Sequence, residues 1–302
     1  MGALVEVNTD GLAKLADTVG GWLGLNARAI ELNAEAEAFA VVRRVDAENA
    51  ATLARLEGEE QVANYIHARE KRKMENAKSV AQLAQSQMVE GEAVSSEPVN
   101  PDWINRFFSI VEEVSDSQMQ RLWAQILAGE VKQPKSYSLR TLETLRNMTK
   151  EEADIFVKAT TYILDGDSII TEPGFSLSVE EQLLLSDIGL VNNEVLTVTY
   201  TMQAQEEPSF IAVDRDFGVG IYNPDIPVIR LEFSVKSLTK AGKELVKLID
   251  YTASDVVYKC VVAKSKQQRC KAVIKSPIVE HLPSGHCTYS KKGVILYQQD
   301  EK

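Results

Sequence analysis

The runs Trp103-Ile-Asn-Arg-Phe-Phe-Ser-Ile-Val111 and Met119-Gln-Arg-Leu-Trp-Ala-Gln-Ile-Leu127 hold the densest set of large apolar side chains in the sequence. In both runs these side chains recur with the i, i+3, i+4, i+7 spacing of one helix face. Only a short polar connection separates the runs, so they predict two helices that fold back on each other or cross at an angle. We expect this pair to form the core of a helical domain.

Local signals predict the ends of the two helices. Asn100 before Pro101 indicates the start of the first helix, because Asn is a good cap and Pro suits the first helical position. Ser115 with Gln118 has the spacing of a capping box and predicts the start of the second. Gly129 stands where a left-handed C-terminal cap is expected.

Composition restricts the class of protein. A chain of 302 residues is long enough for about two domains. The net charge of -11 argues against broad attraction to nucleic acid or anionic lipid. Three cysteines without a CxxC pair favour a reducing compartment. No signal peptide is expected, nor an apolar run of the ~18 residues that a membrane span needs. The predicted location is the cytoplasm, with the inner membrane surface as the alternative.

Residues 26–88 contain no proline and a single glycine and are rich in Ala, Glu, Arg and Gln, which predicts one long helix. Its apolar positions are thinly and irregularly spaced, and a helix gains most of its stability from packing. The rest of the chain or the same helix of another copy would have to cover it, and we favour self-association. The residues predicted to lie at a partner or oligomer interface are Leu12, Leu15, Trp22, Leu23, Phe39, Val42, Val45, Leu53 and Leu56.

Residues 9–25 form an amphipathic segment with Trp22 and several leucines. Helices of this kind can lie in a membrane interface, but those usually carry several Lys or Arg, and this one has only Lys14. Docking on protein is therefore the preferred interpretation, and peripheral membrane contact through residues 9–25 is the alternative.

The pattern changes near Asp165. Ser178 with Glu181 predicts a helix that ends at Gly189, and Thr239 predicts the cap of another. Alternating or β-branched runs predict strands at residues 195–202, 228–235, 256–263 and 294–297. A helix followed by two strands is similar to a winged helix.

The predicted fold class is therefore mainly α, with a long N-terminal helix, a helical core and a C-terminal α+β module that is winged-helix-like. The predicted domains are an amphipathic segment (1–25), the long helix (26–88), an acidic linker (89–99), the helical core (100–165) and the α+β module with a basic tail (166–302).

A family resemblance rests on several runs of the sequence. They are Trp103-Ile-Asn-Arg-Phe-Phe108, Val114-Ser-Asp, Met119-Gln-Arg-Leu-Trp-Ala-Gln-Ile-Leu-Ala-Gly-Glu130, Ser136-Tyr-Ser-Leu-Arg-Thr-Leu142 and Leu238-Thr-Lys-Ala-Gly-Lys-Glu-Leu245. Together with the Ala/Glu-rich helix before them, they resemble a bacterial family catalogued only as a domain of unknown function. The resemblance implies a prokaryotic or phage source and no assigned activity. By analogy with other helical families of this kind, it suggests a link to antiviral defence.

Three groups of residues were considered for a metal or cofactor site. Glu130 and Lys132 have the Glu-x-Lys spacing of metal-dependent nucleases, but they follow a helix, where the lysine answers the helix dipole. Asp214, Asp216 and Asp225 could offer oxygen ligands, but the spacing of a calcium loop is absent. A dinucleotide loop at Gly218 and Gly220 is rejected because Asn223 stands where a third Gly is needed.

The cysteine and histidine residues of the C-terminal part are Cys270, His281, His286 and Cys287. Their spacing fits no common zinc finger, and unligated residues are the preferred interpretation. We therefore predict no catalytic, cofactor-binding or metal-binding residue.

The C-terminal part also carries a run of basic residues. This run is either an edge strand protected by lysines or a surface for phosphate backbones. Its candidate nucleic-acid contacts are Lys264, Lys266, Arg269 and Lys271.

The sequence favours a non-enzymatic, self-associating scaffold or adaptor with an unknown protein partner. The alternatives are a winged-helix nucleic-acid binder and an enzyme of a class that no motif identifies.

Overall fold

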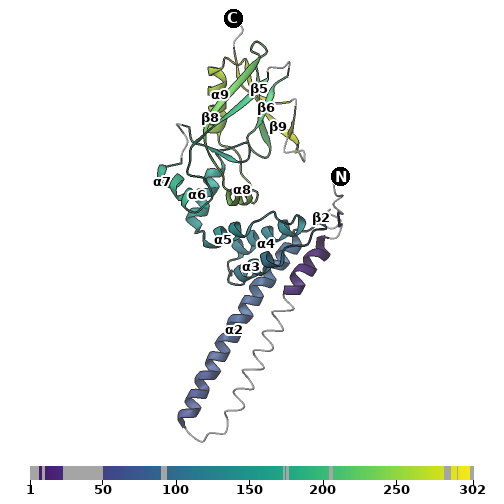
Figure 1. Cartoon of the computed structure of the whole chain (residues 1–302), viewed down its shortest axis with the longest axis vertical. Coiled ribbons are helices and arrows are strands. Elements are labelled where there is room, and N and C mark those ends of the chain that lie inside the picture. Colours follow the sequence, from purple (N-terminus) through teal and green to yellow (C-terminus); the bar gives the residue numbers. More distant parts are fainter. Residues whose placement is uncertain are drawn as a thin grey trace. The chain divides into compact units, whose positions relative to one another are not determined.

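A computed structural model of the chain describes residues 7–8, 11–22, 50–89, 94–172, 174, 177–203, 207–281, 287–290 and 292–299, except for the side chains of 7–8, 50–57, 59–60 and 281. The chain is divided into two compact units, Met1–Leu142 and Glu143–Lys302. Figure 1 draws the helices and strands of both units, and each unit has its own buried core.

The unit Met1–Leu142 is built on helices. A helix of residues 11–22 precedes α2 (Ala50–Ser86), α3 (Pro101–Val111), α4 (Ser117–Lys132) and the start of α5 (Leu139–Asn147). A short antiparallel pair of β1 (Val7–Asn8) and β2 (Val94–Ser95) lies beside them. The buried face of α3 and α4 forms an aromatic core in which the ring of Phe107 meets those of Trp103, Phe108 and Trp123. The sequence prediction of a helix pair is confirmed.

Two of the predicted helix ends are wrong, and both have a physical reason. Asp116, not Ser115, caps α4, because the Asp116 carboxylate accepts the free N–H groups of Gln118 and Met119. Gly129 does not end α4, which continues to Lys132. A Cβ at this glycine would lie 2.8 Å from the buried ring of Tyr137, so the glycine permits close packing inside the helix. The predicted cap at Asn100 is confirmed, since its side chain accepts from the N–H groups of two following residues.

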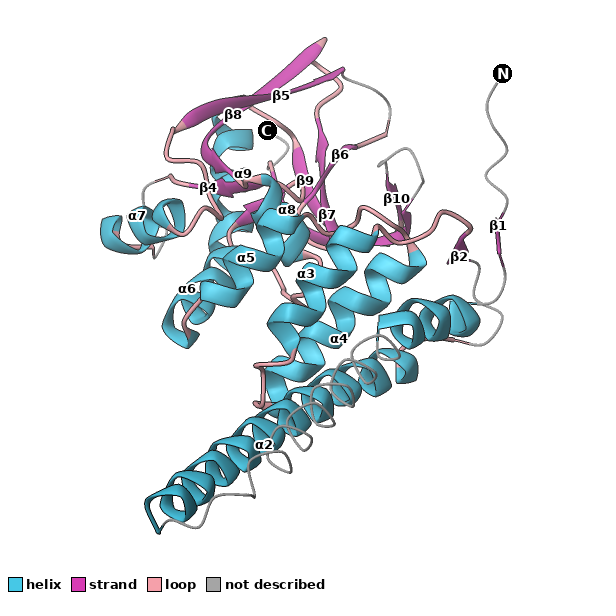
Figure 2. Ribbon diagram, turned by 60° about the horizontal axis from the view of Figure 1, so that its bottom comes forward, coloured by secondary structure: helices cyan, strands magenta, loops and turns pink. Residues whose placement is uncertain are grey.

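The unit Glu143–Lys302 contains two antiparallel sheets. The four-stranded sheet has the order β3 (Ile163–Leu164), β4 (Ser168–Ile170), β8 (Val228–Ser237) and β5 (Leu196–Gln203). The five-stranded sheet has the order β10 (Cys287–Tyr289), β9 (Ala272–His281), β7 (Phe217–Tyr222) and β6 (Ser209–Ala212), with β11 (Val294–Gln298) also paired to β9. The helices are α6 (Lys150–Thr160), α7 (Val179–Asp187), α8 (Lys240–Val246) and α9 (Asp255–Gln267), and Figure 2 shows α9 close to β8.

The predicted fold class is wrong: the chain is an α+β protein rather than a mainly α one, with two antiparallel sheets in its second unit. The winged-helix-like interpretation fails with it, because β6 and β7 lie between β5 and β8 in sequence and belong to the other sheet. The predicted strands at 195–202, 228–235 and 294–297 correspond to β5, β8 and β11 and are confirmed.

The predicted strand at 256–263 is helix α9 instead. Val257, Tyr258, Val261 and Ser265 are its buried residues, at helical spacing, and Ser254 caps it. An apolar run of β-branched residues fits either period, and packing against β7, β8 and β11 selects the helix here.

Candidate functional site

One stripe of α2 changes its environment along the helix. Positions 62, 66, 69, 73, 76, 80 and 84 follow each other by three or four residues and therefore lie on one face. At its C-terminal end this face packs against α3 and α4, and Ala77, Val80 and Ala84 are fully buried. We call these three residues the covered seam.

A network of polar side chains lies at the point on α2 where its packing against α3 and α4 ends. The Asn76 amide donates to Glu112 O at 2.9 Å and to Ser115 Oγ at 3.1 Å, and Gln120 donates to Val114 O at 2.9 Å. These bonds hold the connection between α3 and α4 on α2. One turn earlier, Lys73 Nζ donates to Glu112 Oε1 at 2.9 Å, which raises the pKa of Lys73.

Beyond this point the stripe continues without a described partner element. Val62 and Ile66 extend the series at the same spacing and are 59% and 39% exposed, and Tyr65 beside them is 70% exposed. Figure 1 shows α3 and α4 beside one end of α2 while the other end extends past them. We call Val62, Tyr65 and Ile66 the open seam.

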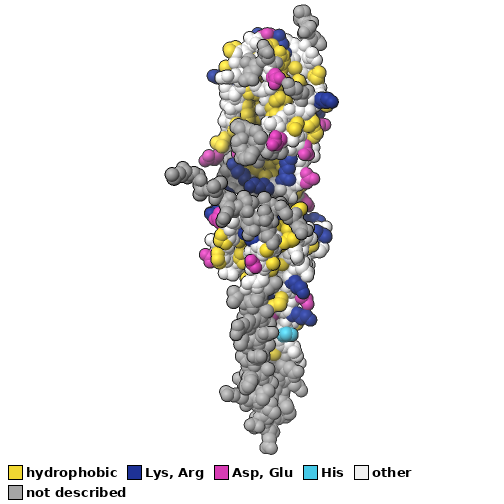
Figure 3. Space-filling model, turned by 90° about the vertical axis from the view of Figure 1, so that its right-hand side faces the viewer, with side chains coloured by type: hydrophobic (Ala, Val, Ile, Leu, Met, Phe, Trp, Pro, Cys, Tyr) yellow, Lys and Arg dark blue, Asp and Glu magenta, His cyan; other side chains and the backbone are white. Residues whose placement is uncertain are grey.

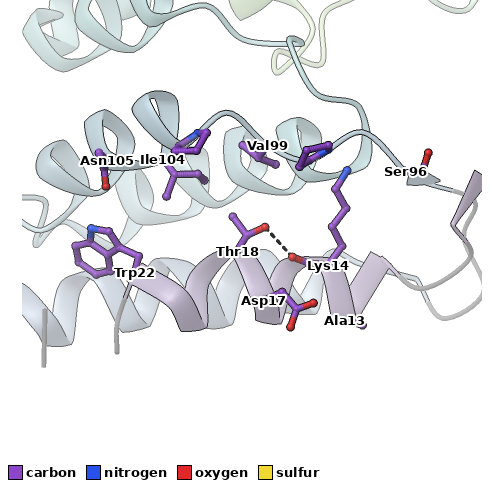
Figure 4. A pocket seen from close by; sticks show the side chains of 11 residues that line it. Ala13, Lys14, Asp17, Thr18, Trp22, Ser96, Val99, Ile104 and Asn105 are labelled. Atoms are coloured by element: carbon purple, nitrogen blue, oxygen red, sulfur yellow. Dashed lines mark hydrogen bonds between the residues drawn. The ribbon is translucent and has the colours of Figure 1, made fainter. Parts of the chain in front are cut away.

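A cavity of about 540 Å³ lies in the helical unit between the helix of residues 11–22, residues 96–101 and the start of α3. Lys14, Thr18 and Trp22 point from the helix toward Val99 and Ile104 (Figure 4). The Trp22 ring stacks on Phe108 with centroids 4.0 Å apart, so Trp22 packs against the aromatic core of its own unit.

The amine of Lys14 in this cavity is already engaged. Lys14 Nζ donates to Ser95 O at 2.8 Å, and burial lowers the pKa of Lys14 against the opposing pull of Glu97 and Glu130. The other polar side chains of the lining are Asp17, Thr18, Ser96 and Asn105. The lining thus combines apolar walls with a few polar groups, an arrangement suited to binding.

The residues considered as a nuclease-like pair have structural roles. Glu130 is 2% exposed, and its carboxylate accepts from the N–H groups of Lys135 at 2.6 Å and Tyr137 at 2.9 Å, which fixes the loop after α4. Lys132 Nζ donates to Gln87 O at 3.2 Å. These contacts account for both residues without a metal.

The three aspartates considered as cation ligands do not converge. Asp214 is buried and accepts from the N–H groups of Asp216, Phe217 and Ala253 and from the Tyr258 hydroxyl. Asp225 pairs with Lys271 at 2.7 Å. No group of three or more metal-ligating side chains occurs in the described part of the chain.

The Gly-x-Gly run belongs to strand β7 and not to a phosphate loop. The rings of Phe210 and Tyr289 stack on each other with centroids 4.3 Å apart. A Cβ at Gly218 would collide with Tyr289, and one at Gly220 would lie 2.6 Å from Phe210. The two glycines therefore make room for this aromatic pair.

The Cys/His residues are described only in part. Cys270 is fully buried, and burial raises the pKa of its thiol. His286 lies outside the described residues, as does the side chain of His281. Burial also raises the pKa of Cys260, to about 11, so this thiol is a poor nucleophile near neutral pH.

The basic residues of the C-terminal part are largely engaged within their unit. Lys264 pairs with Glu172 at 2.9 Å, Lys266 lies 4.6 Å from the Tyr297 ring centroid, and Lys271 pairs with Asp225. Arg269 has a positive φ of 56° at the end of α9. Hydrophobic, basic and acidic side chains are interspersed on the face of this unit in Figure 3. Nucleic-acid contact stays a prediction.

Apart from Trp22, which stacks on Phe108, the predicted interface residues fall into two groups. Leu15 is 3% exposed, and it lines the space between its helix and α2 together with Leu12, so an intramolecular contact accounts for both. Leu23, Phe39, Val42 and Val45 lie outside the described residues, as do the side chains of Leu53 and Leu56. No sequence pattern singles out Tyr65 or Gly58, and the i, i+4 spacing of Val62 and Ile66 is the available signal for this surface.

Among the helices that the structure describes, none combines the length and apolar character that crossing a membrane requires. Membrane contact through residues 9–25 stays a prediction.

Comparison with known proteins gives one match. No curated protein and no solved structure matches the chain. Residues 60–165 match the family model described as "Protein of unknown function (DUF2806)". The segment includes the second half of α2 and all of α3 and α4, so the chain is similar over this segment to an uncharacterised domain-of-unknown-function family.

Proposed function

We propose that this protein is a non-enzymatic scaffold that self-associates through the open seam of α2. The observation that carries the proposal is the change along one helix face: Val80 is fully buried, whereas Val62 is 59% exposed. Exposed apolar patches on a helix are typical of surfaces that bind another protein. The rest of the chain remains available to present a further partner, as an adaptor would.

Continuity with an internal interface supports a helical occupant. The face that carries the open seam is the same face that α3 and α4 cover farther along α2. A helix laid on Val62 and Ile66 would extend this packing by the same ridge-and-groove contacts.

Gly58 supports a second copy as that occupant. It lies inside α2, is exposed, and an added Cβ would find nothing within 4 Å. A glycine at such a position costs the helix about 1 kcal/mol relative to alanine and has no reason within the described chain. Gly58 and Ile66 both lie four residues from Val62. A two-fold axis near Val62 therefore brings Ile66 of each copy close to Gly58 of the other, where only a glycine leaves room.

The chemistry of the polar residues agrees with a non-enzymatic role. Glu130 and Asp214, the buried acids of the candidate sites, accept several backbone N–H groups each and hold loops in place. Acids used in this way are structural rather than catalytic.

Light scattering after size-exclusion chromatography tests the proposal on the full chain. We expect a mass above that of the monomer, which V62E/I66E lowers because it removes the contact through α2. The control N64E/A68E adds the same charge to exposed positions on the opposite face of α2 and should leave the mass at the wild-type value. A monomeric wild-type mass at all concentrations, or equal masses for the two double variants, would overturn the proposal.

A further inference from the structure

We propose that β5 pairs with β5 of a second copy, in antiparallel orientation, about a two-fold axis at Thr199. This contact is independent of α2. It goes beyond the proposed function, because it adds a second homotypic interface to the one through the open seam.

The first observation is the position of β5. It is the outer strand of the four-stranded sheet and pairs with β8 along all eight of its residues, from Leu196 to Gln203, without a bulge. No other strand of the described residues pairs with it. Its outer edge therefore presents the backbone N–H and C=O groups that another strand can bind.

The second observation is that β5 lacks the usual protection of an edge. Proteins keep edge strands short, bulged, charged or interrupted by proline. The other outer strands of the two sheets follow this rule: β3 has two residues, β6 has four, β10 has three and a bulge, and β11 has five and a bulge. By contrast, Leu196-Thr-Val-Thr-Tyr-Thr-Met-Gln203 has eight residues and neither charge nor proline.

The third observation identifies a second copy as the occupant. In an antiparallel pair centred on Thr199, Thr197 faces Thr201, Val198 faces Tyr200 and Leu196 faces Met202. Each pair joins side chains of the same kind, and threonine pairs and aromatic pairs with β-branched residues stabilise antiparallel strands. The exposed face of β5 carries Thr197, Thr199, Thr201 and Gln203, so it has no like charges to repel across the junction. A self-complementary strand of this kind suits the isologous contact of a two-fold dimer.

The consequence concerns assembly. One two-fold contact in the unit Met1–Leu142 and another in the unit Glu143–Lys302 would allow each copy to bind two others. Copies joined through both contacts would form a closed assembly of more than two copies or an open filament, rather than a dimer.

Cysteine cross-linking of the full chain tests the pairing. Directly opposed residues of antiparallel strands have Cα atoms about 4.5–5.5 Å apart, within the range of a disulfide. We expect Thr199→Cys to form a disulfide-linked dimer under mild oxidation, and mass spectrometry should identify the cross-linked peptide that joins position 199 of one copy to position 199 of the other. Thr197→Cys is the control, because its two copies would be about 14 Å apart in this register.

The combination of Thr197→Cys with Thr201→Cys in two separate chains should restore the cross-link. Cross-linking of Thr199→Cys should also persist in V62E/I66E, which separates this contact from that of α2. Equal and low cross-linking of Thr199→Cys and Thr197→Cys would overturn the proposal. So would cross-linking of Thr199→Cys only through native Cys260 or Cys287.

Discussion

The two halves of α2 have the same helical backbone but different surroundings. The C-terminal half lies in a network of apolar and amide contacts with α3 and α4, whereas the N-terminal half exposes Val62, Tyr65 and Ile66. Both halves are rich in Ala and Glu, which favour a helix, although the lysines of α2 all lie in its C-terminal half. The difference shows that the partner of a helix, more than its own propensity, decides which of its residues form a core.

The largest expected difference in the free energy of unfolding is between an aromatic residue of the α3–α4 core and an aromatic residue of the open seam. Phe107→Ala removes a fully buried ring that contacts three other rings and should lower the free energy of unfolding by about 3–5 kcal/mol. Tyr65→Ala, at a position 70% exposed, should change it by about 0.5 kcal/mol or less in dilute solution.

Denaturation followed by tryptophan fluorescence measures the free energy of unfolding of the two variants, because Trp22, Trp103 and Trp123 all lie in the unit Met1–Leu142. Similar losses for the two variants would contradict the contrast between the buried core of α3 and α4 and the exposed Tyr65 of α2.

A second pair compares two glycines inside helices. Gly129→Ala places a Cβ 2.8 Å from the ring of Tyr137, which is buried and whose backbone carbonyl accepts from Trp103 Nε1, and should cost about 1–3 kcal/mol. Gly58→Ala meets nothing within the described chain and should stabilise the monomer by up to about 1 kcal/mol.

A larger side chain at Gly58 should weaken self-association, although alanine at this position should stabilise the monomer. Gly58→Leu should weaken the dimer in sedimentation measurements while the fluorescence midpoint of dilute protein stays near that of Gly58→Ala. If Gly58→Leu dimerises as tightly as the wild type, the glycine is not part of the contact.

The smallest expected effect lies at the border of the two halves. The hydrogen bond from Lys73 holds the pKa of Glu113 below its usual 4.5, so this contribution is present above pH 4.5 and is lost as the pH falls through the lowered pKa. The hydrogen bond to Glu112 raises the pKa of Lys73 above 10.5, so the contribution of the charged lysine is present below pH 10.5 as long as its carboxylate partners are ionised, and it is lost as the pH rises through the raised pKa.

Lys73→Met should therefore cost about 1 kcal/mol at pH 7 and should reduce the loss of stability between pH 5 and about 3. Exposed Lys71→Met is the control. Unfolding midpoints at several pH values decide the question, and parallel curves for wild type and Lys73→Met would show that the bond contributes nothing.

The sequence predicts those parts of the fold that local chemistry determines. The predicted capping box of Ser178 with Glu181 is present, and Gly189 ends α7 with a positive φ. The errors occur where tertiary contacts decide. Tyr137 keeps Gly129 inside a helix, and packing against two sheets turns residues 256–263 into α9.

Strand β7 was not predicted, because its alternate glycines are explained only by the rings of Phe210 and Tyr289, which come from distant parts of the sequence. The candidate site shows the same limit. The spacing of Val62 and Ile66 is visible in the sequence. What separates the open seam from the covered seam is the connection between α3 and α4, which is bonded to Asn76 of α2 and which the sequence does not reveal.

The most direct test of the central claim is the accessibility of the open seam as a function of protein concentration. In full-length chains carrying Val62→Cys or Asn64→Cys, the alkylation rate of the new cysteine is measured by peptide mass spectrometry over a wide range of concentration. Self-association through the open seam predicts that the rate at position 62 falls as concentration rises, while the rate at position 64, on the opposite face, stays constant. Equal rates at position 62 across the whole range would contradict the account.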